Sequence, residues 1–144
     1  MHPFPHRYAV SAMAGPASVV TLRSAELEDI QSSAPPEFGG PPGNWSPETL
    51  LVAAIADCYV LSFRAVANAS KLEWSEIDCD ALGVLEKTAQ GLWFTVIELK
   101  AHLRIPAGGD VARAERLLEK AEQACLVSKS LRSEVRLQAE VRVG

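Results

Sequence analysis

The sequence lacks low-complexity tracts, clusters of basic residues and any basic run that alternates with aromatic residues. Its 14 lysine and arginine residues are scattered among 18 acidic residues, and the formal net charge is −4. Nucleic-acid binding needs a basic surface, so this charge pattern argues against a nucleic-acid-binding protein. With 48% hydrophobic and 22% charged residues over 144 positions, the chain is typical of a globular protein. We expect a single domain over residues 1–144.

The sequence also lacks an export signal and an uninterrupted membrane span. Residues 1–6 are too few and too rich in proline to form the apolar core of a signal peptide, and we expect them to form a disordered tail. Residues 50–69 are apolar, but Asp57 and Arg64 interrupt them, and a charge at the bilayer centre costs about 3 kcal/mol. A core helix is therefore favoured over a membrane span. We expect the protein to be cytoplasmic, with its cysteines reduced.

The N-terminal third alternates between short apolar runs and turn residues. Residues 8–14 and 19–23 are predicted to be strands on either side of a turn at residues 15–18, and residues 26–30 are a candidate third strand. Residues 34–44 contain prolines that lack amide donors and glycines without conformational preference, so they predict a loop.

A long helix is predicted after this loop, with Ser46 as its N-cap. Pro47 suits the first helical position, and Glu48 lies near the positive end of the helix dipole. The face opposite the expected core is also largely apolar up to Arg64, and one subunit offers little to cover it, so we expect a homodimer. The apolar positions that recur at helical spacing and predict the buried stripe are Leu51, Ile55, Cys58, Leu61, Ala65 and Ala69.

The C-terminal half predicts a β-hairpin, a second helix and a final strand. Residues 77–86 and 92–105 alternate between apolar and polar side chains, as the two strands of a hairpin do. Asp110 caps a second helix whose apolar stripe ends at Cys125, and residues 134–143 alternate again. This order of elements predicts the α+β class with a mostly antiparallel sheet.

Three cysteines carry the clearest chemistry in the chain, and their odd number argues against a framework of structural disulfides. Cys58 lies midway along the predicted apolar helix, and Cys125 lies near the end of the second helix. A thiol in a dry apolar site beside a partner thiol can reduce peroxides through a sulfenic acid and then a disulfide. Buried cysteines are more often small hydrophobic residues, so spacing alone leaves both interpretations open. Cys79 is assigned a structural role, because the negative charges of Asp78 and Asp80 keep a thiol protonated.

Three segments of the sequence resemble the OsmC/Ohr family of thiol-dependent peroxidases. They are residues 37–40 in the loop, residues 46–59 around Cys58, and residues 124–131 around Cys125. The resemblance implies an OsmC-like fold, in which antiparallel sheets pack around a central buried helix and a second helix. It also implies an intertwined homodimer with its sites at the subunit interface, and no metal, haem or flavin cofactor.

The resemblance implies roles for the two thiols as well. Cys58 is expected to be the peroxidatic cysteine, whose thiolate attacks a hydroperoxide and becomes a sulfenic acid, and Cys125 the resolving thiol that forms a disulfide with it. A dithiol reductant of the lipoyl type would then regenerate both thiols. An apolar pocket beside Cys58 would favour organic hydroperoxides over hydrogen peroxide. The residues expected to line this pocket are Ile55, Tyr59, Phe63 and Trp45.

Glu48 matches the glutamate that in this family holds an arginine against the reactive sulphur. Ten residues along one helix place Glu48 about 15 Å from Cys58, so it must act through that arginine, across the dimer or from a bend. The arginine has no direct counterpart here, because residues 35–46 contain none. Arg7 and Arg23 are the candidates nearby, and Arg23 is the better of the two. Leu126 also replaces the proline that usually follows the second cysteine. We therefore expect a thiol peroxidase whose activity is weak.

A second hypothesis, motivated by the missing arginine, is a dimer that binds apolar ligands with weak or no turnover. Asp57, directly before Cys58, adds a negative charge that disfavours a thiolate. Other thiol chemistry, such as acyl transfer, lacks a general base. His2 and His6 lie in the expected tail, and His102 lies among strand charges and is expected to be solvated.

Overall fold

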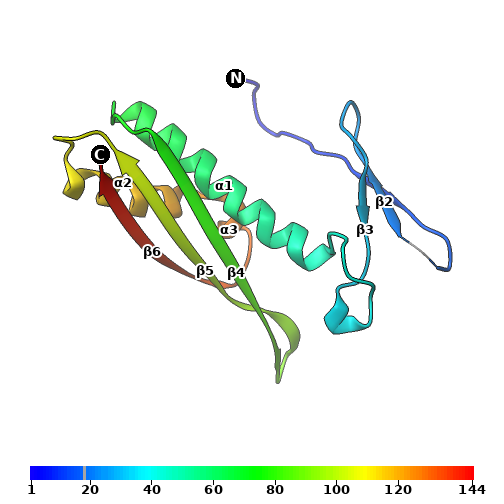
Figure 1. The fold of residues 1–144 in the computed structure, drawn as a ribbon. Coiled ribbons are helices and arrows are strands. Elements are labelled where there is room, and N and C mark those ends of the chain that lie inside the picture. Colours follow the sequence, from blue (N-terminus) through cyan, green and yellow to red (C-terminus); the bar gives the residue numbers. More distant parts are fainter. Residues whose placement is uncertain (18) are drawn as a thin grey trace. The chain divides into compact units, whose positions relative to one another are not determined.

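The computed structural model describes residues 1–17 and 19–144, which form two compact units, residues 1–50 and residues 51–144 (Figure 1). Each unit is described by itself. Residues 1–6 have no helix or strand and are exposed. Whether the whole chain is one domain, and whether residues 1–6 are disordered, remain predictions.

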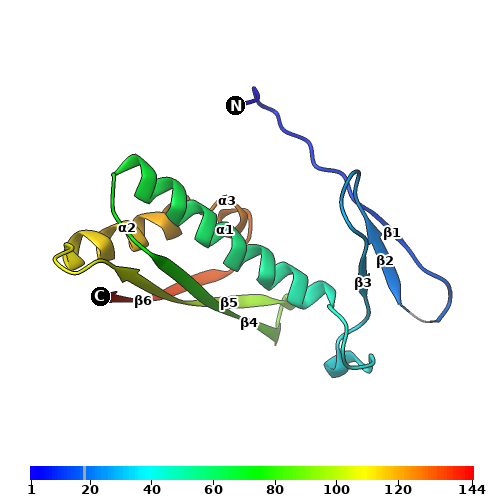
Figure 2. The same cartoon turned by 45° about the horizontal axis from the view of Figure 1, so that its top comes forward.

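The first unit is built on a small antiparallel sheet. Strands β1 (Ser11–Met13), β2 (Val20–Arg23) and β3 (Ile30–Ser32) pair in the order β1-β2-β3 (Figure 2). The candidate third strand at residues 26–30 was placed too early, because Glu26 adopts a left-handed φ of 65° in a turn and pairing begins only at Ile30. The predicted turn at residues 15–18 includes Ser18, which lies outside the described residues.

The loop predicted at residues 34–44 is irregular apart from one short 3₁₀ helix, Pro36–Phe38. Gly39 ends this helix with a φ of 82°, a conformation that favours glycine. At Gly40 an added methyl would lie 1.8 Å from the carbonyl oxygen of Ala34, so no larger residue fits there. The glycines of this loop are therefore required by its backbone path.

Helix α1 (Pro47–Ala69) begins where the sequence predicts, with Ser46 as its N-cap. The Ser46 hydroxyl accepts a hydrogen bond from the backbone N–H of Thr49 at 3.1 Å, and the Thr49 hydroxyl accepts one from the backbone N–H of Ser46 at 2.9 Å. This reciprocal pair satisfies two amide donors that the helix itself leaves free.

The second unit contains a three-stranded sheet and two further helices. Strands β4 (Glu76–Thr88) and β5 (Gly91–Ile105) form the predicted hairpin, and β6 (Glu134–Val143) pairs with the other side of β5. The β4–β5 pair is antiparallel, whereas β6 runs parallel to β5. A parallel neighbour needs a crossover, which is supplied by helix α2 (Val111–Ala124) and the short helix α3 (Leu126–Lys129). The α+β class is confirmed, and its sheet is mixed rather than wholly antiparallel.

The core of this unit lies between one face of the sheet and the helices α1 and α2 (Figures 1 and 2). Alternate residues of β5 point into it, as the period of a strand requires. The buried stripe of α1 is shifted from the predicted one, because Leu61 is 50% exposed while Tyr59 and Phe63 are fully buried. The buried core residues are Ile55, Tyr59, Phe63, Ala67, Ile97, Leu99, Ala101, Leu103, Ile105, Ala114, Leu117, Leu118 and Ala121.

Within residues 51–144, helix α1 is covered on one side only. It has 23 residues and is long and apolar enough to cross a membrane, yet its stripe at Ile55, Tyr59 and Phe63 packs in the core of the unit. It is therefore a core helix rather than a membrane span. Only 28% of the most apolar 18-residue stretch of this helix is buried, so much of its apolar side stays outside the core.

The contact between α1 and the sheet predicts a sensitive position at Gly83 on β4. A methyl group added there would lie 2.7 Å from Cγ2 of Val52 and 3.1 Å from the ring of Phe94. We expect Gly83→Ala to lower the free energy of unfolding by about 1–3 kcal/mol, measured by urea denaturation. Gly15→Ala is the control, because its methyl meets nothing closer than 3.9 Å. Equal stabilities of the two variants would contradict this description of the helix–sheet contact.

Candidate functional site

The second unit brings together two cysteines that lie far apart in the sequence. Cys58 is half-buried on α1, and Cys125 is 0% exposed between α2 and α3. Because α1 and α2 pack on the same face of the sheet, Cys125 lies close enough to Cys58 for that thiol to raise the pKa of Cys125. The two thiols expected from the sequence are therefore neighbours, and both are reduced here.

The surroundings of Cys125 favour its protonated form. Burial raises the pKa of the Cys125 thiol, and contact with Cys58 raises it further, while hydrogen bonds from Ser128 partly oppose the shift. The Ser128 hydroxyl also donates to the Cys125 carbonyl oxygen at 3.1 Å. The net effect is a thiol that stays neutral at neutral pH.

Cys58 has a different environment, because it is only half-buried and lies beside a hydroxyl group. Its Sγ is 4.0 Å from Oγ of Ser62, one helical turn further along α1. Asp57, the preceding residue, is exposed to solvent. Ser62 and Ser128 were not singled out from the sequence, although their spacings of four and three residues from the two cysteines are a signal that could have found them.

Cys79 lies on the core-facing side of β4, as part of the same neighbourhood. Burial raises the pKa of its thiol to about 11, and the charges of Asp80, Asp78 and Cys125 add to the shift. The sequence interpretation assigned a protonated thiol to the neighbouring aspartates alone. The structure makes desolvation the larger cause.

Glu48 and Arg23, the other two predicted site residues, are not brought together within the first unit. Arg23 donates from Nε to Oδ2 of Asp29 at 3.0 Å, and its side chain is 57% exposed. Oε1 of Glu48 is buried and has no hydrogen-bond partner among the described residues. A buried carboxylate oxygen without a donor is costly, so this arrangement favours a donor from outside the described contacts.

The apolar residues expected to line a pocket beside Cys58 occupy other positions. Ile55, Tyr59 and Phe63 are fully buried in the core, because the stripe of α1 that faces the sheet includes all three. The Tyr59 hydroxyl donates to the Leu118 carbonyl oxygen at 3.0 Å, and burial raises its pKa. Trp45 is 52% exposed and lines a pocket of about 280 Å³ in the first unit.

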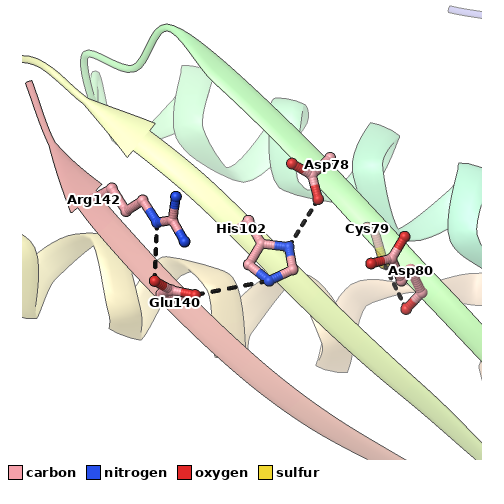
Figure 3. Close-up of polar contacts among 6 residues, drawn as sticks. All are labelled: Asp78, Cys79, Asp80, His102, Glu140 and Arg142. Atoms are coloured by element: carbon pink, nitrogen blue, oxygen red, sulfur yellow. Dashed lines mark hydrogen bonds and ion pairs between the residues drawn. The ribbon is translucent and has the colours of Figure 1, made fainter.

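A separate polar cluster lies on the sheet face that carries no helix (Figure 3). Nδ1 of His102 is 2.8 Å from Oδ1 of Asp78, and its Nε2 is 3.7 Å from Oε2 of Glu140. The other carboxylate oxygen of Glu140, Oε1, accepts a hydrogen bond from Nε of Arg142. Ligand atoms of Asp78, Asp80 and His102 lie within 4.8 Å of one another, which is close enough for a metal ion. Both ring nitrogens already face carboxylates, so the cluster is explained as a network of surface ion pairs.

The shifted pKa of Cys79 predicts its reactivity. Because the folded state holds the proton more tightly than an ordinary thiol, with a pKa of about 11 against 9.0, alkylation of Cys79 by iodoacetamide should reach half its maximum rate near pH 11. For the same reason the free energy of unfolding should fall as the pH rises from about 9 to about 11. Peptide mass spectrometry separates Cys79 from the other thiols. A midpoint near pH 9 would show that Cys79 is sterically protected but not shifted.

Comparison with known proteins agrees with this architecture. A family model described as OsmC-like protein matches residues 40–140. The chain is 30% identical to the uncharacterised protein YmaD of Bacillus subtilis over 87% of this chain and 85% of YmaD. It is also 30% identical to peroxiredoxin OsmC of Escherichia coli, over 73% of this chain and 72% of the relative. The structure of an organic hydroperoxide resistance protein OsmC from Legionella pneumophila superposes with a TM-score of 0.76 at 26% identity, covering 96% and 98% of the two chains. The chain belongs to the OsmC-like family.

Proposed function

We propose that this protein is a thiol-dependent peroxidase that reduces organic hydroperoxides with Cys58 and Cys125. The observation that carries the proposal is the proximity of these two side chains, one half-buried and the other fully buried with a pKa that Cys58 helps to raise. Relatives named peroxiredoxin and organic hydroperoxide resistance protein support the reaction class.

The different environments of the two sulphurs support different roles. The half-buried Cys58 is open to a small substrate, and its thiolate attacks the distal oxygen of the hydroperoxide. The O–O bond breaks, Cys58 becomes a sulfenic acid, and the alkoxide leaves as an alcohol after taking up a proton. The sulphur supplies both electrons.

Cys125 suits the second step, because burial keeps its thiol neutral until a sulfenic acid forms beside it. Its sulphur then attacks the Cys58 sulfenic acid, an S–S bond forms, and the hydroxyl group leaves as water with the thiol proton. A dithiol reductant of the lipoyl type, acting in the cytoplasm, returns both thiols by exchange and becomes a disulfide itself.

Glu48 and Arg23 are proposed as residues that position the reactive sulphur through a guanidinium group. The buried, unpartnered oxygen of Glu48 supports a need for such a donor. Arg23 would have to exchange Asp29 for Glu48 to provide it. An arginine from a second subunit would meet the same need, and the activity should be weak where neither does.

The uncovered face of α1 supports a homodimer. Without a partner, most of the apolar 18-residue stretch of this helix would stay outside the core, because only 28% of that stretch is buried within the chain. A second copy of the chain supplies an equally apolar helix to cover it, with the two faces related by symmetry.

The peroxidase reaction predicts the fate of each thiol. One equivalent of cumene hydroperoxide should remove two titratable thiols per chain and give a mass consistent with a Cys58–Cys125 disulfide. Cys58→Ser should lower peroxide consumption by about a thousandfold or more, since it removes the nucleophile. Cys125→Ser should instead leave a sulfenic acid at Cys58 that dimedone traps. Cys79→Ser is the matched control and should keep the activity.

The alternative function, a dimer that binds apolar ligands without turnover, is favoured by one observation. Within residues 51–144, no lysine or arginine side chain is hydrogen-bonded or ion-paired to Cys58. If all thiols remain titratable after hydroperoxide and the Cys58→Ser variant consumes peroxide at the same rate as the parent, this alternative replaces the peroxidase proposal.

The dimer predicts that one charge on α1 disrupts assembly. The parent chain should give twice its 15.5 kDa mass in size-exclusion chromatography with light scattering. Leu61→Glu should shift this mass towards the monomer, because Leu61 is 50% exposed on the apolar helix. Leu126→Glu, at a leucine that is 71% exposed outside α1, is the control. A parent protein at 15.5 kDa would rule out the dimer.

A further inference from the structure

The hydroxyl group of Ser62 lies next to the sulphur that the proposed reaction uses first. Cys58 and Ser62 are four residues apart on α1, so their side chains share one face of the helix. Oγ of Ser62 is 4.0 Å from Sγ of Cys58, and both residues are half-buried. A serine inside a helix commonly bonds to the carbonyl oxygen one turn earlier. In residues 51–144 the hydrogen-bond contact of this hydroxyl is with the sulphur instead.

The ionisation state of Cys58 decides how strong this contact is. When the thiol is neutral, either group can donate and the bond between them is weak. When Cys58 is a thiolate it has no proton to give, so Ser62 must donate, and a hydrogen bond to an ion is shorter and about twice as strong. The hydroxyl group therefore stabilises the thiolate more than the thiol.

The other contacts described around Cys58 within residues 51–144 supply no cation that would stabilise its thiolate. Within residues 51–144, no arginine or lysine side chain forms a hydrogen bond or ion pair with Cys58. Cys125 is buried and neutral, so it adds no charge beside the Cys58 sulphur. The Ser62 hydroxyl is thus a fixed donor that the same helix holds against the reactive sulphur.

We propose that Ser62 is a positioning residue that donates an O–H···S⁻ hydrogen bond to the Cys58 thiolate and raises its population. The proton stays on Ser62, and no covalent bond changes. The inference rests on the proposed function, because it affects peroxide reduction only if Cys58 is the attacking thiol. In this proposal the Ser62 hydroxyl group provides a part of the thiolate stabilisation that a nearby cation would otherwise provide.

The test is the pH profile of Cys58 alkylation by iodoacetamide, resolved by peptide mass spectrometry on the otherwise unchanged, reduced chain. At about pH 7, Ser62→Ala should lower the Cys58 rate about two- to tenfold, the loss expected for one hydrogen bond to the ionised form. At about pH 10, where an ordinary thiol is ionised, the rates of variant and parent should converge. Ser62→Thr keeps the hydroxyl group and should restore most of the rate at pH 7.

Two controls separate this role from a structural one. Ser70→Ala removes a half-buried hydroxyl directly after the end of α1, about 12 Å from Ser62 along the helix axis, and should leave the Cys58 rate unchanged. Circular dichroism of each variant checks that α1 is intact. A Ser62→Ala rate that equals the parent at pH 7, or that stays low by the same factor at pH 10, overturns the proposal.

The alkylation assay does not depend on peroxidase activity. If hydroperoxide leaves Cys58 unmodified but Ser62→Ala still shifts the alkylation profile, the proposed function fails and the contact of Ser62 with the thiolate stands. If hydroperoxide oxidises Cys58 and the profile is unchanged in Ser62→Ala, the peroxidase stands and the role of Ser62 fails.

Discussion

The packing of α1 and α2 against one face of the β4–β5–β6 sheet is the constraint on which the site depends. It places Cys58 and Cys125 side by side, although one lies in the middle of a long helix and the other at a helix junction. The parallel pairing of β6 with β5 is part of this constraint, since it requires α2 and α3 to cross back over the sheet. Cys125 lies at the point where the two helices of this crossover meet.

The same packing makes the two sulphurs unequal. Complete burial raises the pKa of Cys125 and holds its proton, whereas Cys58 stays half-buried and open to a small molecule. The proposed two-step peroxidase reaction would use this difference, because one sulphur has to react with the substrate and the other has to stay protonated until the sulfenic acid has formed. Cys79, kept protonated by burial on β4, takes no part in that division.

The two faces of the sheet differ in polarity, because successive side chains of β5 point to opposite faces and alternate between apolar and polar. Ile97, Leu99 and Leu103 point into the core, while His102 between them in sequence faces Asp78 and Glu140 on the open face. The polar network on the open face is compatible with exposure to water, whereas the uncovered side of α1 is apolar.

Local patterns in the sequence were sufficient to predict the N-cap at Ser46, the β-hairpin and the α+β class, because short-range hydrogen bonding and side-chain periodicity control these features. The resemblance of the segments around Cys58 and Cys125 identified the family. The buried stripe of α1, which contains Tyr59 and Phe63 rather than Leu61, could not be predicted, because the helix is apolar all round and only the sheet selects a face. The sequence by itself determined which elements form and which residues carry sulphur. Only the tertiary structure decided the parallel pairing of β6 and the burial that raises the pKa of Cys125, because each depends on contacts between a residue and surroundings that folding assembles.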